Sequence, residues 1–377
     1  MPGLLKETGP VESGLRDALE RATTRSTPDD DVLPRIRVYD GPRLDYPGAE
    51  RVTHAGLPVG SLSKWFDATC PSSSACLAFN EVDAWSPPLA DLLAREMSAD
   101  IADALGDPRA GLEWYAFLGR RGHTPFGLHS DPESSMIFHL GPAPKEVWVF
   151  DRKALPQLPN RRQITFDYDE LLPLARHVVL QPGDYLLIPA HSFHVFKNAG
   201  FAAFLGLTIF PQDVRRELAE IVMRQLPLPP ARHLTDAQAR EYVAFASGAL
   251  AEVKDTVATA QDTSQRRLRS LAWTRPSYIP PQPLVDGEVR VAELPVVPSQ
   301  PGARPALFAG GRTVSLPAGA DQALIAGAIP IGERLSRTDL EDLLIQALPG
   351  ADSATAAGLI DALARCGTFR PASGGPS

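Results

Sequence analysis

The feature that most restricts the fold of this 377-residue chain is a series of short apolar segments between residues 112 and 210. Each has the length and composition of a β-strand, and Gly- and Pro-containing turns such as Gly-Pro-Ala-Pro and Pro-Gly-Asp separate them. The expected strands are 112–118, 134–140, 146–151, 177–180, 185–189 and 201–210. Many short strands joined by such turns are typical of a sandwich or barrel, and we expect a jelly roll.

The sequence before these strands is more irregular. Residues 1 to about 50 mix Pro, Gly, Asp and Arg without a sustained period, so we expect a partly disordered tail with a short helix at 15–21. A first strand is expected at 34–40, and irregular β structure in 52–79. Residues 86–105 form the first clear helix, because a capping Ser, a Pro and one continuous apolar face follow each other there.

The composition changes after Pro211. An amphipathic pattern over 214–226 predicts one helix. A second helical stretch is expected to follow Thr235 and to run, with breaks, to about Trp273. Prolines recur throughout 276–305, which is typical of an extended linker. The rest of the chain shows a short β segment, helices around 318–328, 336–348 and 353–365, and a terminal strand. This order suggests a winged-helix-like module.

These patterns predict an α+β chain with a double-stranded β-helix, or jelly-roll, core. The expected parts are a tail (1–50), a jelly-roll domain (51–211), a helical segment that would suit dimerisation (212–275), a linker (276–305) and a winged-helix-like domain (306–372).

The charge of the chain limits the classes of binding partner that it fits, and its cysteine content bears on the redox compartment. The net charge of −8 argues against a nonspecific polyanion binder. Residues 306–377 hold five Arg and no Lys against seven acidic residues, so we expect that module to contact protein and not nucleic acid. Three cysteines without C-x-x-C spacing fit a reducing cytoplasm. Neither a membrane span nor an export signal is indicated.

Two short motifs carry the chemistry. His129 and Asp131 form an H-x-D pair, and His194 closes the sequence Pro-Gly-Asp-x4-Pro-x4-His. Residues two apart on a strand point to one face, and a jelly roll can bring a distant strand back beside them. Two imidazoles and one carboxylate are the ligand set of a mononuclear non-haem Fe(II) oxygenase. The alternative is that Asp131 caps a local turn or helix and that His194 packs in the core. An H-x-D pair without the distant His motif would favour this alternative.

The other histidines fall into rival metal ligands and residues with other expected roles. His123 and His191 are the rival ligand candidates. His191 and His139 are expected either beside the pocket or packed in the core. The histidines expected in surface or structural roles are His54, His177 and His233.

An iron site of this kind needs two electrons from elsewhere, and 2-oxoglutarate is the usual donor. Its distal carboxylate requires a buried cation, but the expected strand 201–210 after His194 has no basic residue. Lys145 opens the strand after the H-x-D strand and could reach inward. The alternative is a solvated Lys at a turn edge, with Arg152 or Lys197 as the anchor.

Taken together, the run H-x-D … G-x-x-x-K-x-x-x-x-F … P-G-D-x-x-x-x-P-x-x-x-x-H resembles the JmjC-type branch of the cupin superfamily, the 2-oxoglutarate oxygenases. The resemblance implies that His129, Asp131 and His194 are the iron ligands. It also implies that Lys145 anchors the 2-oxoglutarate carboxylate.

The same resemblance implies cosubstrate contacts at Thr124, Ser135 and Thr208. The order of jelly roll, helical segment and winged-helix-like tail is similar to that of the bacterial ribosomal-protein hydroxylases of this branch. Architecture of this kind fits many chemistries.

The expected reaction uses Fe(II), 2-oxoglutarate and O2 and hydroxylates a C–H bond while succinate and CO2 are released. A polypeptide side chain is the preferred substrate, either in a ribosomal protein or in a ribosomally made natural-product peptide. The alternatives are a free amino acid or small metabolite, a metal-binding cupin without oxygenase activity, and a noncatalytic DNA-binding regulator.

Overall fold

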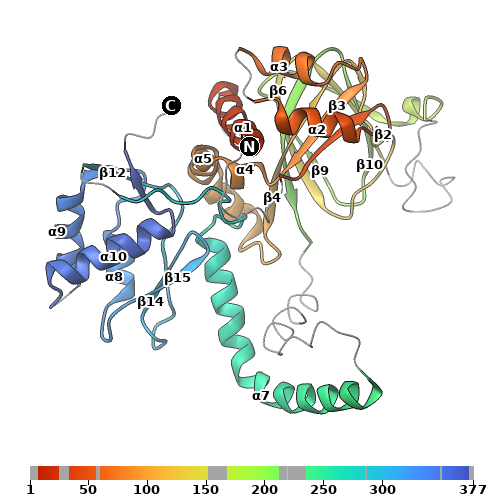
Figure 1. Cartoon of the computed structure of the whole chain (residues 1–377). Coiled ribbons are helices and arrows are strands. Elements are labelled where there is room, and N and C mark those ends of the chain that lie inside the picture. The colour runs from red at the N-terminus through yellow and green to blue at the C-terminus, as the bar shows by residue number, and fades with distance from the viewer. Residues whose placement is uncertain are drawn as a thin grey trace. The chain divides into compact units, whose positions relative to one another are not determined.

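The computed structural model describes residues 7–24, 34–56, 60–151, 168–211, 219, 235–284, 287–348 and 350–372 (Figure 1). The chain folds into two compact units. The first consists of residues 1–211, 274–282 and 292–294, and the second of residues 212–273, 283–291 and 295–377.

Two antiparallel sheets build the first unit. The larger has the strand order β2-β1-β3-β4-β11-β6-β9, and the smaller has the order β5-β10-β7-β8. Their bounds are β1 Ile36–Asp40, β2 Arg43–Leu44, β3 Ala75–Asn80, β4 Leu112–Gly119, β5 Gly122–His123, β6 Ser134–Pro142, β7 Lys145–Phe150, β8 Arg176–Leu180, β9 Tyr185–Ile188, β10 Phe193–Asn198 and β11 Ala202–Ile209. All six strands predicted between 112 and 210 are present, and so is the first strand predicted at 34–40.

Apolar side chains from both sheets share one core cluster. Phe117, Ile137 and Phe204 come from the larger sheet, and Val147 and Phe196 come from the smaller. Two antiparallel sheets that bury their facing side chains against each other are the jelly-roll arrangement expected from the strand pattern.

The helices of the first unit are α1 Thr8–Thr23, α2 Tyr46–His54, α3 Leu62–Thr69, α4 Val82–Trp85 and α5 Pro87–Leu105, with a short 3-10 helix at Leu172–Leu174. Helix α5 begins and ends as predicted. The Ser86 hydroxyl accepts a hydrogen bond from the Leu89 N–H, and Gly106 follows the helix with a positive φ of 68°.

Two stretches differ from expectation. Helix α1 is longer than the predicted 15–21, and it packs a buried apolar face that includes Val11, Leu15 and Leu19 against α4 and α5. The prediction of irregular β structure in 52–79 is wrong at 52–54 and 62–69, because these residues belong to α2 and α3. Helix α3 spans only eight residues, which is too short for a helical period to stand out in the sequence.

The second unit contains the long helix α7 (Asp236–Arg269), which is continuous and begins after Thr235, whose hydroxyl accepts a hydrogen bond from the Gln238 N–H. Its other elements are β12 Glu288–Val291, β13 Val297–Pro298, β14 Ala306–Ala309, β15 Arg312–Ser315, α8 Gln322–Ala328, β16 Arg334–Ser336, α9 Arg337–Ala347, α10 Ser353–Arg365 and β17 Phe369–Pro371. Helices α8, α9 and α10 each lie within the ranges predicted for the tail. The helix predicted over 214–226 lies outside the described residues, apart from residue 219.

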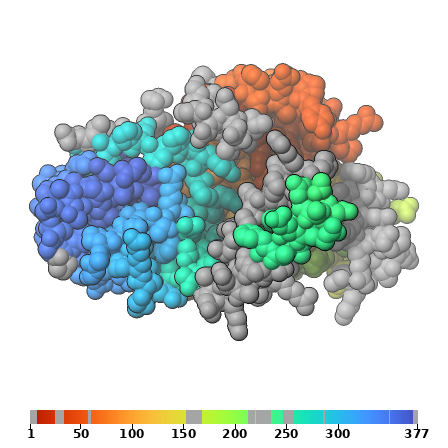
Figure 2. Space-filling view, turned by 60° about the horizontal axis from the view of Figure 1, so that its bottom comes forward, coloured from red at the N-terminus to blue at the C-terminus, as the bar shows by residue number. Residues whose placement is uncertain are grey.

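Two small sheets, β16-β12-β17 and β13-β14-β15, complete this unit. Strand β12 lies in the middle of the first sheet with Val289 and Val291 fully buried, so the proline-rich range 276–305 contains strands as well as extended chain. A single apolar cluster joins both sheets to α8, α9 and α10. Figure 2 shows the described residues after about 305 (blue) packed closely together. None of the described helices is long and apolar enough to cross a membrane.

Candidate metal centre and its pocket

Backbone pairing brings the two predicted motifs together. The segment after β5 pairs with β10 at one point, where the His129 N–H donates to the His194 carbonyl (3.2 Å) and the His194 N–H donates back (2.8 Å). The His191 N–H donates to the carbonyl of Asp131 (2.7 Å) and so fixes the loop between the motifs. As a result, ligand atoms of His129, Asp131 and His194 all lie within 4.8 Å of one another.

Backbone carbonyls orient both imidazoles. Nδ1 of His129 lies 3.0 Å from the Gly127 carbonyl, and Nδ1 of His194 lies 2.9 Å from the Ser192 carbonyl. A carbonyl oxygen can only accept, so each Nδ1 carries the proton and each Nε2 keeps a free lone pair. The two Nε2 atoms lie 3.6 and 3.8 Å from Oδ2 of Asp131.

The donor set fits a divalent metal. Burial and the adjacent His129 lower the pKa of His194 to about 4, which keeps this imidazole neutral. Two imidazoles with orientations set by backbone carbonyls and one carboxylate provide three metal ligands and leave further coordination positions open. Among the described residues, no other group of three or more His, Cys, Asp or Glu side chains has this arrangement.

The three side chains face a pocket of about 330 Å³ between the sheets. Aromatic rings form much of its wall, namely those of Tyr115, Phe117, Phe126, Phe196 and Phe204. Charged side chains other than Asp131 are Arg37 and Glu133. The wall therefore combines aromatic rings with hydroxyl, amide and charged side chains, a mixture that suits a small polar ligand.

Lys145 lies inside the protein. Its side chain is 1% exposed, and Nζ donates a 2.6 Å hydrogen bond to Oδ1 of Asn198. The same nitrogen lies 5.3 Å from the ring centre of Phe196 and 4.8 Å from that of Phe204, and both rings line the pocket. Desolvation by burial lowers the pKa of Lys145 to about 7. The alternative of a solvated Lys at a turn edge is therefore excluded.

Of the two rival cations, Lys197 is not placed for this role. Lys197 lies on the opposite face of β10, where it pairs with Glu146 (3.5 Å) and lies over the Trp148 ring. Arg152 lies outside the described residues.

The three predicted hydroxyl residues, Thr124, Ser135 and Thr208, all line the pocket. Oγ1 of Thr124 is buried and has no hydrogen-bond partner among the described residues, so a bound ligand could satisfy it. Ser135 shares a hydrogen bond with Tyr115, whose pKa is raised by burial.

The other described histidines are not members of the cluster of His129, Asp131 and His194. The ring of His123 packs against Trp148 and Tyr168, and the buried His139 contacts the Ala143 carbonyl (2.8 Å). His191 is exposed, and the rest occupy these places: His54 on α2, His177 stacked on Trp148, and His233 outside the described residues. His123 and His191 are therefore excluded as ligands of this cluster.

Sequence reasoning missed Asn198, Tyr115 and Arg37. Asn198 lies four residues after His194 on β10, a spacing that places both on the same face of that strand. Arg37 donates to Oδ1 of Asn80 (2.7 Å), which holds it at the pocket. Only the spacing from His194 could have indicated Asn198 in advance.

No model of a known protein family matches this chain, and neither does any curated protein. Solved structures do match it. A structure of YcfD, a ribosomal oxygenase from Escherichia coli, has a TM-score of 0.52 at 15% identity and covers 97% of this chain and 91% of that one. A second structure of E. coli ycfD has a TM-score of 0.51 at 15% identity, covering 93% and 88% of the two chains.

A third structure, of YcfD in complex with cobalt and succinic acid, has a TM-score of 0.50 at 15% identity and covers 91% of this chain and 89% of that one. At this identity the likeness shows a shared fold. The two packed antiparallel sheets agree with the predicted α+β chain with a jelly-roll core.

Proposed function

We propose that this chain, which shares the fold of a ribosomal oxygenase, is an Fe(II)- and 2-oxoglutarate-dependent oxygenase. The observation that carries the proposal is the pairing of a His-Asp-His cluster with a buried ammonium beside the same pocket. No carboxylate of the described residues forms an ion pair with Lys145. A buried cation without an anion is costly, and a ligand carboxylate would satisfy it.

Each residue then has a defined task. Nε2 of His129, Nε2 of His194 and a carboxylate oxygen of Asp131 hold the metal. Bound iron would supply the O2 activation that couples decarboxylation of 2-oxoglutarate to hydroxylation of a C–H bond. Lys145 binds the distal carboxylate of 2-oxoglutarate.

Hydroxyl groups and rings complete the cosubstrate site. Thr124 donates its unpartnered hydroxyl to 2-oxoglutarate, and Ser135 and Thr208 offer further hydroxyls on the pocket wall. The rings of Phe196 and Phe204 keep water away from the ammonium, which strengthens its attraction for a carboxylate.

We place the substrate among polypeptide side chains. The supporting observation is that the likeness to YcfD, a ribosomal oxygenase, extends over both units and not only over the jelly roll. The three-stranded sheet β16-β12-β17 with α8, α9 and α10 is consistent with a winged-helix-like module that docks such a partner, and residues 212–275 would suit a homodimer. A small metabolite is the alternative, because it too would fit a pocket of about 330 Å³.

The reaction is tested by incubating the protein with Fe(II), ascorbate and 2-oxoglutarate and measuring succinate. His129→Ala and Asp131→Ala should each abolish turnover, because either change removes one of three metal-binding groups, while the thermal unfolding temperature stays close to that of the wild type. His177→Ala is the control, since this exposed histidine stacks on Trp148 away from the cluster. Turnover that survives both substitutions would refute the metal assignment.

The substrate class is tested by mass spectrometry. Ribosomal proteins and a free amino acid mixture are each incubated with the active protein, and products that gain one oxygen atom are sought. Oxygen incorporation into free amino acids alone would refute the polypeptide assignment.

A further inference from the structure

The hydrogen bond between Lys145 and Asn198 joins two neighbouring strands, and the ammonium of Lys145 lies beside the pocket-lining rings of Phe196 and Phe204. The two residues are directly opposite each other in the pairing of β7 with β10. Both side chains are 1% exposed, and the Nζ to Oδ1 distance is 2.6 Å. At this burial a lost partner would not be replaced by water, so the contact controls where the ammonium lies.

The partners of Asn198 fix which way its amide points. An ammonium group can only donate, so the atom that faces Lys145 must be Oδ1. On the other side, Nδ2 donates to the backbone carbonyl of Arg120 (3.2 Å), which can only accept. A flipped amide would break both hydrogen bonds at once.

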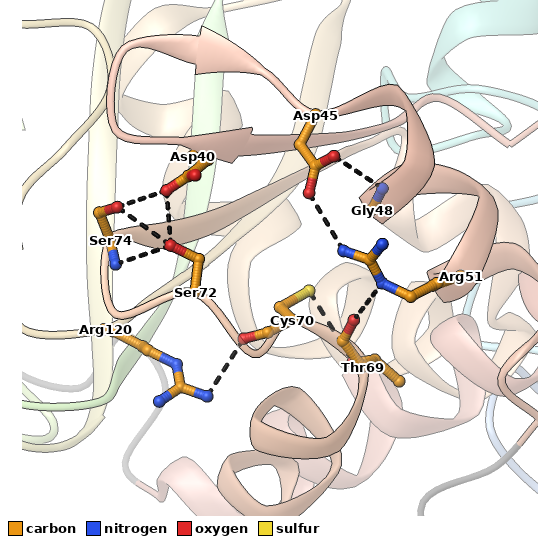
Figure 3. A network of polar contacts seen from close by, with 9 residues as sticks. All are labelled: Asp40, Asp45, Gly48, Arg51, Thr69, Cys70, Ser72, Ser74 and Arg120. Carbon is orange, nitrogen blue, oxygen red and sulfur yellow. Dashed lines mark hydrogen bonds and ion pairs between the residues drawn. The ribbon is translucent and has the colours of Figure 1, made fainter.

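Other contacts hold the backbone of Arg120, whose carbonyl accepts this hydrogen bond, in place. The Arg120 N–H donates to the Ala75 carbonyl (3.1 Å), and its guanidinium donates to the Cys70 carbonyl (3.1 Å) at the end of α3 (Figure 3). An ion pair of 2.9 Å with Asp67 adds to this anchor. The support therefore runs from α3 through Arg120 and Asn198 to the Lys145 ammonium.

A glycine next to Arg120 makes room for this arrangement. A Cβ on Gly119 would lie 2.9 Å from Nδ2 of Asn198 and 3.0 Å from Sγ of Cys76. Both distances are shorter than those of ordinary contacts, so any larger residue here would push the amide away.

From this geometry we propose that Asn198 is a positioning residue that aims the Lys145 ammonium at the distal carboxylate of 2-oxoglutarate. The inference rests on the proposed function. Asn198 occupies one of the three N–H donors of the ammonium and leaves two for the ligand. A neutral acceptor suits this task, because a carboxylate in its place would form a buried ion pair with Lys145 and compete with the ligand.

The test measures binding by calorimetry, titrating 2-oxoglutarate into the full chain loaded with Mn(II). Asn198→Leu removes the buried hydrogen bond that the Lys145 ammonium donates, and it should weaken binding about tenfold. Asn198→Asp replaces this hydrogen bond with a buried ion pair that competes with the ligand, and it should weaken binding about a hundredfold. Lys197→Gln is the matched control, since Lys197 precedes Asn198 on the same strand but lies over the Trp148 ring, and it should leave the affinity unchanged.

A second ligand separates positioning from a general loss of structure. Binding of 2-oxobutyrate, which has the same 2-oxo acid end but no distal carboxylate, should be equal in the wild type and in the Asn198 variants. Asn198 variants that bind 2-oxoglutarate as tightly as the wild type would overturn the inference, as would equal weakening toward both ligands. A wild type that binds no 2-oxoglutarate would instead overturn the proposed function, and the inference with it.

A third variant tests the same inference if the Asn198 variants do not fold. Gly119→Ala keeps every polar group but displaces the amide through its Cβ, and it should weaken 2-oxoglutarate binding while sparing that of 2-oxobutyrate. Unchanged 2-oxoglutarate affinity in this variant, with its fold retained, would overturn the inference.

Discussion

At the scale of single residues, we expect the charge state of Lys145 to set the affinity of the pocket for anions. Its ammonium is surrounded by aromatic rings and by one neutral amide, and desolvation lowers its pKa to about 7. Among the described residues, the titratable groups that act on it are Cys76 and His139. Burial raises the pKa of Cys76 to about 12 and lowers that of His139, so both are neutral near pH 7.

This environment predicts a specific pH dependence of cosubstrate affinity. The lowered pKa of Lys145 means that the ammonium is present below about pH 7 and is lost above it. Since only the ammonium attracts a carboxylate, the dissociation constant of 2-oxoglutarate should be lowest below pH 7 and rise toward about tenfold per pH unit above it. Calorimetry between pH 6 and pH 9 checks this.

Lys145→Met is the control for that measurement. The variant should bind 2-oxoglutarate at least about a hundredfold more weakly at pH 6.5, because a buried carboxylate would have no cation beside it. The remaining affinity should be nearly independent of pH over this range. A pH dependence that persists in Lys145→Met would assign the titration to another group.

At the scale of elements, alternation and turn residues were enough to predict most strands of the jelly roll. Strand β10 was not among them, because its start at Phe193 follows a tight loop in which His191 has a positive φ of 62°. The grouping of His129, Asp131 and His194 was still predictable, since these residues form motifs with characteristic spacing. The role of Asn198 was not, because it depends on cross-strand register with Lys145.

Register also explains a glycine that lies against the pocket-lining ring of Tyr115. Gly206 on β11 is directly opposite Tyr115 on β4, and a Cβ at this position would lie 2.2 Å from the tyrosine ring. The missing side chain lets the ring lie across the neighbouring strand, where its hydroxyl reaches Ser135.

Gly206→Ala should therefore displace the Tyr115 ring. We expect the free energy of unfolding to fall by about 1–3 kcal/mol, because the added methyl overpacks a buried contact. Gly9→Ala is the control, since nothing lies within 4 Å of a Cβ built there. Chemical denaturation measures both variants, and equal stability of Gly206→Ala and the wild type would show that the ring is free to move.

At the scale of the whole molecule, the chain's charge bears on the partner that it meets. The net charge of −8 and the excess of acidic residues in 306–377 favour a basic polypeptide over an acidic one. Exposed charges act through solvent and are screened by salt, whereas the ammonium of Lys145 is shielded from solvent. Substrate docking and cosubstrate binding should therefore respond differently to ionic strength.

This difference provides the last prediction. Raising the salt concentration from about 0.1 M to about 1 M shortens the screening length from about 10 Å to about 3 Å. The KM for a basic polypeptide substrate should then rise at least about threefold, because long-range attraction to the acidic surface is lost. The dissociation constant of 2-oxoglutarate should change much less, since its anchor is buried. Steady-state kinetics and calorimetry in the same buffers measure the two responses, and a KM that is insensitive to salt would contradict electrostatic docking of a basic partner.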